Sequence, residues 1–262
     1  MEVLSLRYNR FKDKTVIVTG GANGIGRATA GLFAEEGAII GVADCNITSA
    51  QMTVKELKKI GAEAIFIEVD VSKREECHKM VKIMVNRYNK LDCIVNAAGV
   101  HRYVPAERIT EDDWNFVLNI NLRGLFWCCQ AAGIQMLKQN YGSIVNVSSV
   151  AAYRTRPLRS VYSSSKAGVS ALTGALAVEW SRYNIRVNAI APSLIKTSMA
   201  INVLKTRKGM EKEMASATAI KRIGNPEEVA ELILFLSSDE ASYITGQTTL
   251  IDGGMSFYDG LE

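Results

Sequence analysis

The fold is set by one stretch near the N-terminus, Thr15-Val16-Ile17-Val18-Thr19-Gly20-Gly21-Ala22-Asn23-Gly24-Ile25-Gly26. Its β-branched start is typical of a buried parallel strand, and a helical pattern follows the glycines as far as Gly37. Glycines in such a turn let the backbone approach a phosphate, and the N–H groups of the following helix face the anion. The stretch therefore predicts a phosphate-binding turn, with a glycine-rich hairpin or a simple cap as the alternative. The candidate cofactor-binding residues here are Gly20, Asn23, Gly24, Ile25 and Gly26.

A second buried strand, Ile39 to Ala43, ends at Asp44. A carboxylate in this place can accept hydrogen bonds from both hydroxyls of an adenosine ribose, and it repels a 2′-phosphate. Asn23 and Cys45 stand where a basic side chain would help to bind that phosphate, and neither is basic. The pattern therefore favours NAD over NADP as the cofactor. The alternative is that Asp44 only caps the next helix.

Strands and helices alternate along the rest of the chain. Further strands are expected over 64–67, 91–95, 142–147, 185–190 and 248–251, with helical patterns between most of them. This alternation predicts an α/β fold: a doubly wound parallel sheet of the Rossmann type, with about seven strands and helices on both faces. No repeat, low-complexity tract or linker divides the sequence, so one domain is expected over residues 1–262.

Two segments depart from this regular pattern. A long helix is expected from Trp114 to Leu137, but Asn119 and Asn121 interrupt its apolar face. A buried amide is unfavourable unless it is hydrogen-bonded. Asn121 therefore either holds a water or a backbone carbonyl beneath an active site, or it is a satisfied core asparagine. Later in the chain, charged and apolar positions mix without a clear face, which predicts a mobile substrate lid around 193–216.

Tyr162 and Lys166 are candidate proton-transfer residues. They stand at positions i and i+4 of a predicted helix, so the phenol and the ammonium share one helix face. A free phenol has a pKa of about 10 and is a poor proton carrier at neutral pH. A cation about 5 Å away stabilises the phenolate by roughly 3 kcal/mol at an effective dielectric constant near 20. Taken alone, such a pair is weak evidence and is more typical of an ordinary surface helix.

Composition excludes several classes of protein. Of 262 residues, 48% are hydrophobic and 22% are charged, which is typical of a globular protein. The net charge of +4 is scattered, so nucleic acid is not an expected partner. No apolar run approaches the roughly 18 residues of a membrane span, and the N-terminus lacks a secretory signal. Five cysteines without a C-x-x-C pair predict free thiols in the cytoplasm, and two histidines are too few for a His-rich metal site.

Together these motifs resemble the single-domain branch of the short-chain dehydrogenase/reductase family, from about Lys12 to Met255. The motifs occur in the family's order: T-G-x-x-x-G-x-G at 19–26, Asp70, Asn-Ala-Ala-Gly at 96–99, Asn121, Ser149, Tyr162-x-x-x-Lys166, and Pro192 with Thr197. The resemblance implies a hydride transfer with NAD that interconverts a secondary alcohol and a ketone. It also implies a homotetramer that uses helices around 111–138 and 162–183 and the C-terminal strand.

The resemblance also implies the catalytic roles. Tyr162 would be the general acid/base, and Ser149, thirteen residues before it, would hydrogen-bond the substrate oxygen in preference to Ser148. Lys166 would hold the nicotinamide ribose and lower the pKa of Tyr162, and Asn121 would support a water-linked proton path. The remaining implied cofactor-binding residues, beyond the glycine turn and Asp44, are Asp70, Val71, Asn96, Ala97, Ala98, Gly99, Tyr162, Lys166, Pro192, Ile195 and Thr197.

Two features of the sequence lie outside the family pattern: Ser193, near the expected nicotinamide site, and Arg159, near the expected substrate site. The family usually has glycine after the proline of the sixth strand, whereas this chain has Ser193, which restricts the backbone and puts the nearby nicotinamide contacts in doubt. Arg159 stands three residues before Tyr162, and with His101 it could bind an anionic substrate such as a hydroxy acid or sugar acid. The alternative for Arg159 is a solvated arginine at a subunit edge.

Two other functions compete with this interpretation. The first is a reductase of 3-oxoacyl thioesters that uses NADPH, against which Asp44 argues. The second is a non-catalytic nucleotide-binding protein on the same fold, against which the intact Ser149, Tyr162 and Lys166 argue.

Overall fold

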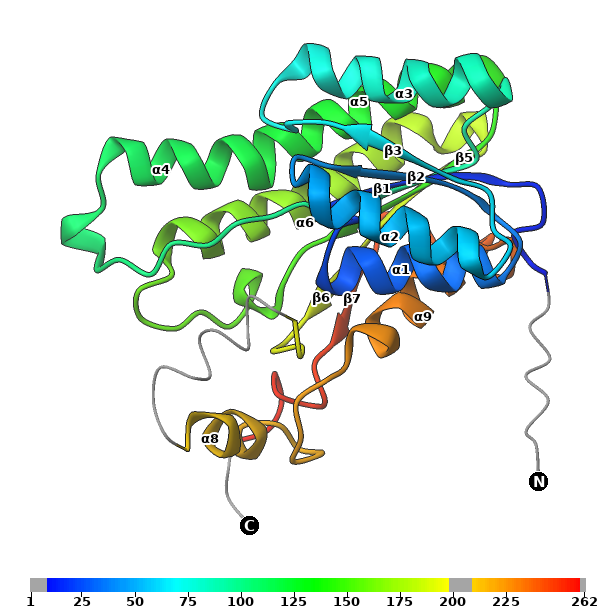
Figure 1. Cartoon of the computed structure of the whole chain (residues 1–262). Coiled ribbons are helices and arrows are strands. Elements are labelled where there is room, and N and C mark those ends of the chain that lie inside the picture. The colour runs from blue at the N-terminus through cyan, green and yellow to red at the C-terminus, as the bar shows by residue number, and fades with distance from the viewer. Residues whose placement is uncertain (1–8, 198–208, 260–262) are drawn as a thin grey trace, which may run out of the picture.

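The computed structural model describes residues 9–197 and 209–259 (Figure 1). In this part of the chain, seven strands form one sheet in the order β3-β2-β1-β4-β5-β6-β7, and every neighbouring pair is parallel. The predicted doubly wound parallel sheet is confirmed. The strands are β1 (Thr15–Thr19), β2 (Ile39–Asp44), β3 (Ala64–Glu68), β4 (Cys93–Asn96), β5 (Gly142–Val147), β6 (Ile185–Pro192) and β7 (Thr248–Ile251).

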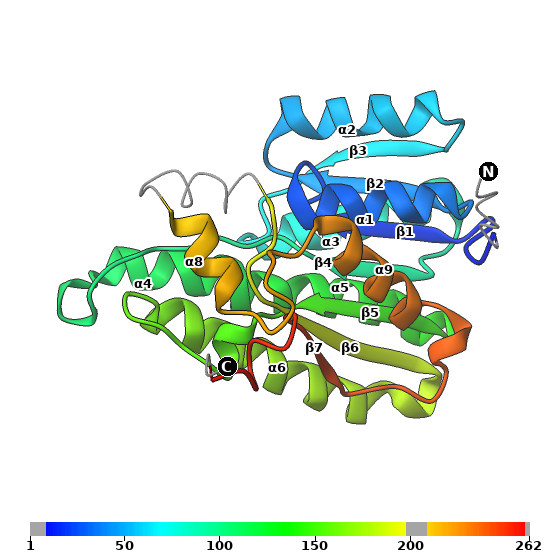
Figure 2. The same cartoon turned by 90° about the horizontal axis from the view of Figure 1, so that it is seen from below.

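Helices cover both faces of this sheet (Figures 1 and 2). One core cluster packs α1, α2 and α9 against the sheet, and a second packs α3, α5 and α6 against the opposite face. The central strands are buried between the layers because their residues are apolar on both sides; Val16, Ile17 and Val18 are fully buried, whereas the edge strand β7 is only partly buried. The longer helices are α1 (Gly24–Glu35), α2 (Ile47–Lys59), α3 (Arg74–Tyr88), α4 (Glu111–Leu118), α5 (Leu125–Gln139), α6 (Ser160–Trp180), α8 (Met210–Ser216) and α9 (Pro226–Ser237).

The helical pattern expected from Trp114 to Leu137 is found, within a longer helical segment from Glu111 to Gln139. A π-helical turn, η2 (Asn119–Gly124), joins α4 to α5 at the point where Asn119 and Asn121 interrupt the pattern. Two contacts explain this turn. Asn121 is fully buried and hydrogen-bonds outside its own helix, and Gly124 lies so close to the carbonyl of Val71 that a Cβ would be 2.7 Å from that oxygen. The turn therefore widens where a polar side chain leaves the helix face.

The strand order reverses between β1 and β4, which neighbour each other although two strands intervene in sequence. In open parallel sheets, ligands bind outside the carboxyl ends of the strands at this reversal. The glycine turn follows β1, the segment 96–99 follows β4, and Ser149 follows β5. The fold thus gathers three of the predicted motifs at one edge.

The segment expected to form a lid is only partly described. Residues 198–208 lie outside the described residues, so the lid stays a prediction. On one side of the gap, Ile195 pairs with Gly224 in an isolated bridge. On the other side, α8 contacts the loop before α6 through Arg156, whose Nη1 lies 3.0 Å from the sulfur of Met214.

Other expectations concern membranes, metals and thiols. None of the helices within 9–197 and 209–259 has the length and apolar character that a membrane crossing requires. In the same ranges, no group of three or more histidine, cysteine or acidic side chains is placed to hold a metal ion. All five cysteines are free thiols, as predicted.

Replacing Gly26 by alanine should destabilise the glycine turn. A Cβ on Gly26 would lie 2.2 Å from the carbonyl oxygen of Gly20, so the helix or the turn must shift. We expect a loss of about 1–3 kcal/mol in the free energy of unfolding, measured by urea denaturation. The control is Gly31→Ala in the same helix, where nothing lies within 4 Å of the added Cβ. That change should be neutral or stabilise by up to about 1 kcal/mol, and equal destabilisation by both variants would contradict the packing argument.

Candidate active site

The glycine turn brings three separate segments together. Gly20 has a φ of +67°, and a Cβ on it would lie 2.8 Å from the backbone of Ala98. Ala97 donates its N–H to the carbonyl of Thr19 at 3.2 Å. Gly24, with a φ of +54°, would place a Cβ 2.9 Å from Cγ2 of Thr197. Only glycine permits these approaches, because a side chain would fill the space and disfavour the left-handed backbone.

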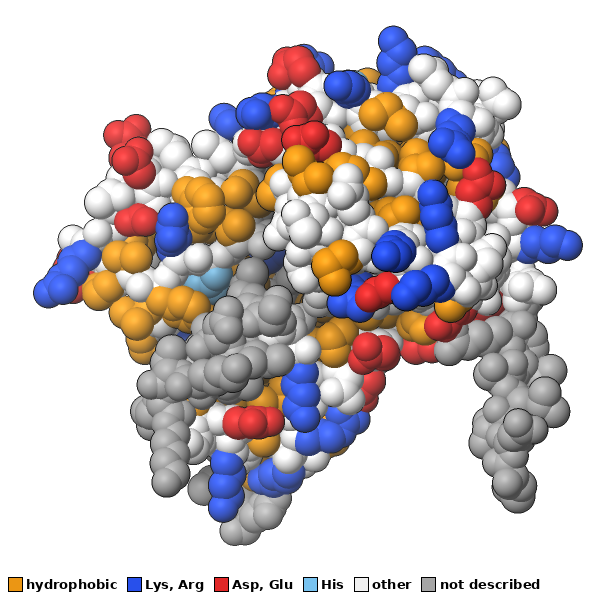
Figure 3. Space-filling view, viewed as in Figure 1, with side chains coloured by type: hydrophobic (Ala, Val, Ile, Leu, Met, Phe, Trp, Pro, Cys, Tyr) orange, Lys and Arg blue, Asp and Glu red, His pale blue; other side chains and the backbone are white. Residues whose placement is uncertain are grey.

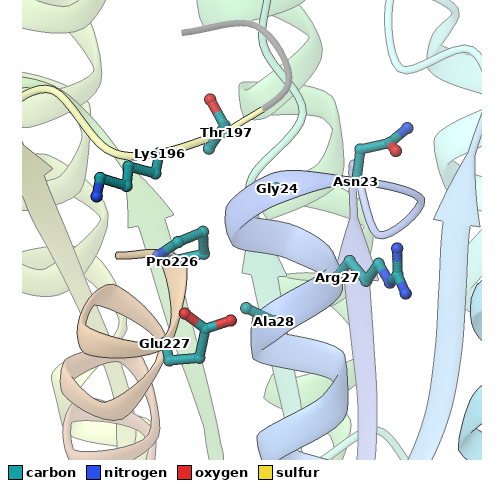
Figure 4. Close-up of a pocket in the computed structure, with 8 residues that line it drawn as sticks. All are labelled: Asn23, Gly24, Arg27, Ala28, Lys196, Thr197, Pro226 and Glu227. Atoms are coloured by element: carbon teal, nitrogen blue, oxygen red, sulfur yellow. The ribbon is translucent and has the colours of Figure 1, made fainter. Parts of the chain in front are cut away.

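A cavity of about 380 Å³ opens beside this turn (Figure 4). The N-termini of α1 and α9 both border it. Of its charged side chains, Arg27 pairs with Glu56 at 2.7 Å and Lys196 lies 4.0 Å from Glu211. The helix N-termini favour an anion such as a diphosphate. The lining residues are Asn23, Gly24, Arg27, Ala28, Lys196, Thr197, Pro226 and Glu227.

Asp44 is held at the end of β2 by two backbone donors. Its carboxylate accepts a hydrogen bond from the N–H of Ala22 at 3.1 Å and another from Asn46 at 2.8 Å. The first contact links Asp44 to the glycine turn. Asn46, not Asp44, caps α2, because its side chain accepts from the N–H of Ser49. The alternative interpretation of Asp44 as the helix cap is therefore excluded.

Asp70 and Val71 form the turn that leads into α3. The carboxylate of Asp70 accepts hydrogen bonds from the N–H and Oγ of Ser72 and lies 3.7 Å from the ammonium of Lys73. Burial raises the pKa of Asp70, but these hydrogen bonds and the lysine charge outweigh it and lower the pKa. The side chain of Val71 is buried in the core. The side chains of both residues are thus engaged within the protein.

The segment from Asn96 to Gly99 presents backbone rather than side chains to the site. Asn96 is buried, and its amide donates to Asn146 and to the sulfur of Cys129. Its side chain therefore belongs to the interior, which sequence reasoning did not foresee. At the other end, a Cβ on Gly99 would lie 3.5 Å from Oδ1 of Asn121 and 3.7 Å from Nζ of Lys166.

The loop after β6 is fixed by the last strand. Ser193 donates its N–H to the carbonyl of Ile251 at 3.2 Å, and its φ is not positive. Serine is therefore accommodated without a positive φ, and the nicotinamide contacts that the missing glycine put in doubt stay a prediction. Ile195 packs its side chain into the core, so its side chain does not face the site. The carbonyl of Pro192 lies 3.5 Å from Oγ of Ser149.

Helix α6 carries Tyr162 and Lys166 to the same edge of the sheet. Lys166 is 4% exposed as a residue, and its ammonium donates to the carbonyl of Val147 at 2.7 Å. Burial lowers the pKa of Lys166 to about 8. Its nitrogen lies 5.8 Å from the centre of the Tyr162 ring. An ammonium has three N–H donors, and Lys166 makes one hydrogen bond within the described chain, so two donors remain for a ligand.

Ser149, and not Ser148, lies beside the phenol. A hydrogen bond from Ser149 lowers the pKa of Tyr162, although burial has a larger opposite effect. The Oγ of Ser149 also accepts from the N–H of Ala151 at 3.1 Å. Ser148 instead donates to the carbonyl of Lys166 at 2.9 Å and therefore anchors the helix.

The expected acidification of Tyr162 by Lys166 is not found. Burial raises the pKa of Tyr162 above its usual value, and only the hydrogen bond of Ser149 and the positive charge of Arg159 act against it. Burial is the dominant cause, and the ammonium of Lys166 donates to the carbonyl of Val147 rather than to the phenol. The phenol is therefore protonated at neutral pH.

Asn121 fixes the backbone that adjoins Gly99. Its Oδ1 accepts from the N–H of Val100 at 2.8 Å, while its Nδ2 donates to the carbonyl of Val100 at 2.9 Å and to Oγ of Ser165 at 3.2 Å. Both interpretations from the sequence contribute: the asparagine is buried and satisfied, and it holds a backbone carbonyl at the site.

His101 and Arg159 also reach the phenol. His101 stacks on Tyr162, and Arg159 lies over the ring of Tyr103, 5.5 Å from its centre. Arg159 makes no ion pair with any described carboxylate, and the residue before it, Leu158, has a φ of +66°, which is strained for a bulky side chain. Tyr103 carried no sequence signal, whereas Ser165 could have been found as the residue one turn after Tyr162.

These residues fit a nicotinamide dinucleotide. The glycine cradle and the cavity suit a diphosphate, Asp44 suits an adenosine ribose, and the two unused donors of Lys166 suit the hydroxyls of a second ribose. Tyr162 and Ser149 lie next to that lysine. The site therefore has a nucleotide-binding end at the glycine turn and Asp44 and a proton-transfer end at Tyr162 and Ser149.

Comparison with known proteins agrees with this arrangement. Residues 20–256 match the family model described as enoyl-(acyl carrier protein) reductase. A 3-oxoacyl-[acyl-carrier-protein] reductase of Thermotoga maritima is 42% identical over 251 residues, covering 94% of this chain and 99% of the relative. An NAD-dependent glycerol dehydrogenase of Listeria innocua is 37% identical and covers 92% of this chain and 93% of the relative.

A solved short-chain type dehydrogenase/reductase from Mycobacterium ulcerans superposes with a TM-score of 0.90 at 29% identity, over 94% of this chain and 90% of that one. The matches extend over nearly the whole chain, from the glycine turn past the Tyr162–Lys166 helix. The chain therefore belongs to the short-chain dehydrogenase/reductase family, whose members are oxidoreductases that act on CH–OH groups with a nicotinamide cofactor.

Proposed function

We propose that this protein is an NAD(H)-dependent oxidoreductase that interconverts a secondary alcohol and its ketone. The observation that carries the proposal is the gathering of Ser149, Tyr162 and Lys166 at the carboxyl edge of the sheet, beside the glycine turn. These residues supply a proton carrier, a hydrogen bond for the substrate oxygen and a buried cation.

In the proposed mechanism, a bound nicotinamide ring accepts or supplies the hydride. During reduction of a ketone, Tyr162 donates its phenolic proton to the carbonyl oxygen while Ser149 donates a hydrogen bond to the same oxygen. During oxidation, the phenolate form of Tyr162, which is reached only after the phenol has lost its proton, takes the proton of the alcohol. Lys166 would bind and orient the cofactor ribose through its two remaining donors, and Asn121 fixes the backbone of Val100. The protonated phenol suits the reductive direction at neutral pH.

Asp44 supports NAD as the cofactor. Its carboxylate is fixed by Ala22 and Asn46, and the neighbouring Cys45 and Asn23 offer no positive charge to a 2′-phosphate. The relative from Listeria innocua is an NAD-dependent enzyme that also falls in this group.

A second candidate function is the reduction of 3-oxoacyl thioesters with NADPH. The relative of 42% identity from Thermotoga maritima favours it, and Asp44 argues against the phosphorylated cofactor. Turnover of a 3-oxoacyl thioester with NADPH in preference to NADH would replace the first proposal. A non-catalytic role would require cofactor binding without any NAD-linked turnover across alcohols, polyols and hydroxy acids.

We also propose a cytoplasmic homotetramer. The free thiols suit a reducing compartment. Hydrophobic side chains gather on the surface over α4, at the left of Figure 3, where Trp114 is 45% exposed and Phe116 is 38% exposed. Ile134 on α5 and Val178 on α6 are exposed as well. Exposed apolar side chains on these helices support subunit contacts there.

Replacing Tyr162 by phenylalanine should lower kcat by about 10²–10⁴-fold, because the ring stays and the proton carrier is lost. The rate is measured from the absorbance of reduced nicotinamide, and NAD affinity is measured separately by calorimetry. Affinity should change little. Tyr243→Phe, a fully exposed tyrosine, is the control and should retain wild-type turnover. Full turnover by Tyr162→Phe would remove the mechanism.

Replacing Asp44 by alanine should raise the KM for NAD by about 10–100-fold, since hydrogen bonds to a charged group are lost, and should improve the use of NADP. The comparison is the ratio of kcat/KM for the two cofactors. Glu68→Gln is the matched control, because Glu68 stands opposite Asp44 at the end of β3 and is exposed. An unchanged ratio in the Asp44 variant would show that this carboxylate does not select NAD.

Replacing Arg159 by alanine should raise the KM for hydroxy acids by about 10–100-fold, because an unpaired, partly buried guanidinium next to the phenol suits a carboxylate. Neutral alcohols should be affected much less. Arg154→Ala is the control. The guanidinium of Arg154 contacts the carbonyl of Met255, so its removal should leave the KM for hydroxy acids and for neutral alcohols unchanged. Equal loss on acids and neutral alcohols would mean that Arg159 only supports the fold.

A further inference from the structure

The imidazole of His101 lies between two tyrosine rings. Its ring centre is 4.2 Å from that of Tyr162, with an interplanar angle of 24°, and 3.9 Å from that of Tyr103, with an angle of 16°. Both faces of the imidazole are covered by aromatic rings, so the nitrogens on its edge are its only means of polar contact. One of the two covering rings carries the phenol that transfers the proton.

Neither nitrogen of His101 has a partner within the described chain. Nδ1 and Nε2 are both buried, and neither has a hydrogen-bond partner of good geometry; the backbone of Arg102 lies near enough only to oppose the fall of the His101 pKa. Buried polar groups are nearly always hydrogen-bonded, and an orphaned one in a native structure needs an explanation. Beside a proton-transfer residue, the simplest explanation is that a substrate supplies the missing partner.

The charge state of His101 restricts what that partner can be. Burial, and after it the positive charge of Arg159, lowers the pKa of His101 to about 4, while the backbone of Arg102 opposes the shift. The imidazole is therefore neutral at physiological pH and has one N–H donor and one acceptor nitrogen. A hydroxyl group can use either nitrogen, whereas a carboxylate can use only the N–H.

We infer that His101 is a specificity residue that hydrogen-bonds a second hydroxyl of the substrate, on a carbon next to the reacting carbinol. The stacking carries this assignment: with the two ring centres 4.2 Å apart, the imidazole lies beside the phenol that meets the reacting carbinol, so its nitrogens can meet a group on a neighbouring carbon. The favoured substrates are then vicinal diols and polyols and the corresponding hydroxyketones. This inference rests on the proposed function and names the substrate class of the same site.

A site with an unsatisfied polar group discriminates strongly. A substrate that lacks the second hydroxyl leaves the buried nitrogens unpaired, and such a loss commonly lowers kcat/KM by about 10–100-fold or more. A hydrophobic wall of the same shape would not make this distinction. Discrimination between a hydroxyketone and the matched simple ketone therefore reports on the nitrogens of His101.

The test compares acetoin with butan-2-one, and butane-2,3-diol with butan-2-ol, using the full-length protein with NADH or NAD. Wild-type protein should prefer the hydroxylated member of each pair by about tenfold or more in kcat/KM. His101→Phe keeps a stacked ring without nitrogens, and it should bring this ratio close to one. His101→Gln keeps polar atoms and should recover part of the preference.

His78→Gln is the control, because it changes the only other histidine of the chain, on α3, and should leave the preference intact. Circular dichroism checks that each variant is folded. If His101→Phe is not folded, the test uses His101→Gln, whose ratio of kcat/KM for the hydroxylated over the simple substrate should lie below the wild-type ratio and above one. No wild-type preference, or an equal loss on both members of a pair, would overturn the inference. Absence of turnover of every alcohol and ketone despite NAD binding would instead overturn the proposed function.

Discussion

The site depends on the hydrogen bond from the ammonium of Lys166 to the carbonyl of Val147, 2.7 Å long and buried. It ties the start of α6 to the end of β5, and Ser148 strengthens the same junction by donating to the carbonyl of Lys166. Tyr162 lies one turn earlier on that helix, so its position follows from this anchor. A buried cation with one hydrogen bond is unfavourable, which is visible in its pKa of about 8. The fold retains it where a ligand can satisfy the remaining donors.

The rest of the site is assembled by the same kind of contact, a side chain that holds backbone from another segment. Asn121 holds Val100, and Asp44 holds the N–H of Ala22 in the glycine turn. Each such contact fixes a loop at the carboxyl edge of the sheet by at least one directional bond. Loops in proteins usually vary in position, and these bonds give the edge the rigidity that hydride transfer between two molecules requires.

Features that rest on local chemistry could be predicted from the sequence. The strands follow from β-branched runs, and the glycine turn follows from its flanking strand and helix. The choice of Ser149 over Ser148 came from the family resemblance, and it agrees with the contact between Ser149 and Tyr162. Features that depend on tertiary packing could not be predicted. The inward side chain of Asn96 and the stacking of His101 arise where distant segments meet, and the raised pKa of Tyr162 arises from burial.

The π-helical turn between α4 and α5 makes this region sensitive to chain length. In a regular α-helix each residue advances the direction of the side chain by about 100°, so removing one residue between Asn119 and Gly124 would restore regular winding and swing Asn121 away from Val100. Point substitutions elsewhere on the turn would leave that direction intact. Over evolutionary time, insertions and deletions should therefore be tolerated less here than at the neighbouring helix ends, even though the turn contains several ordinary apolar residues.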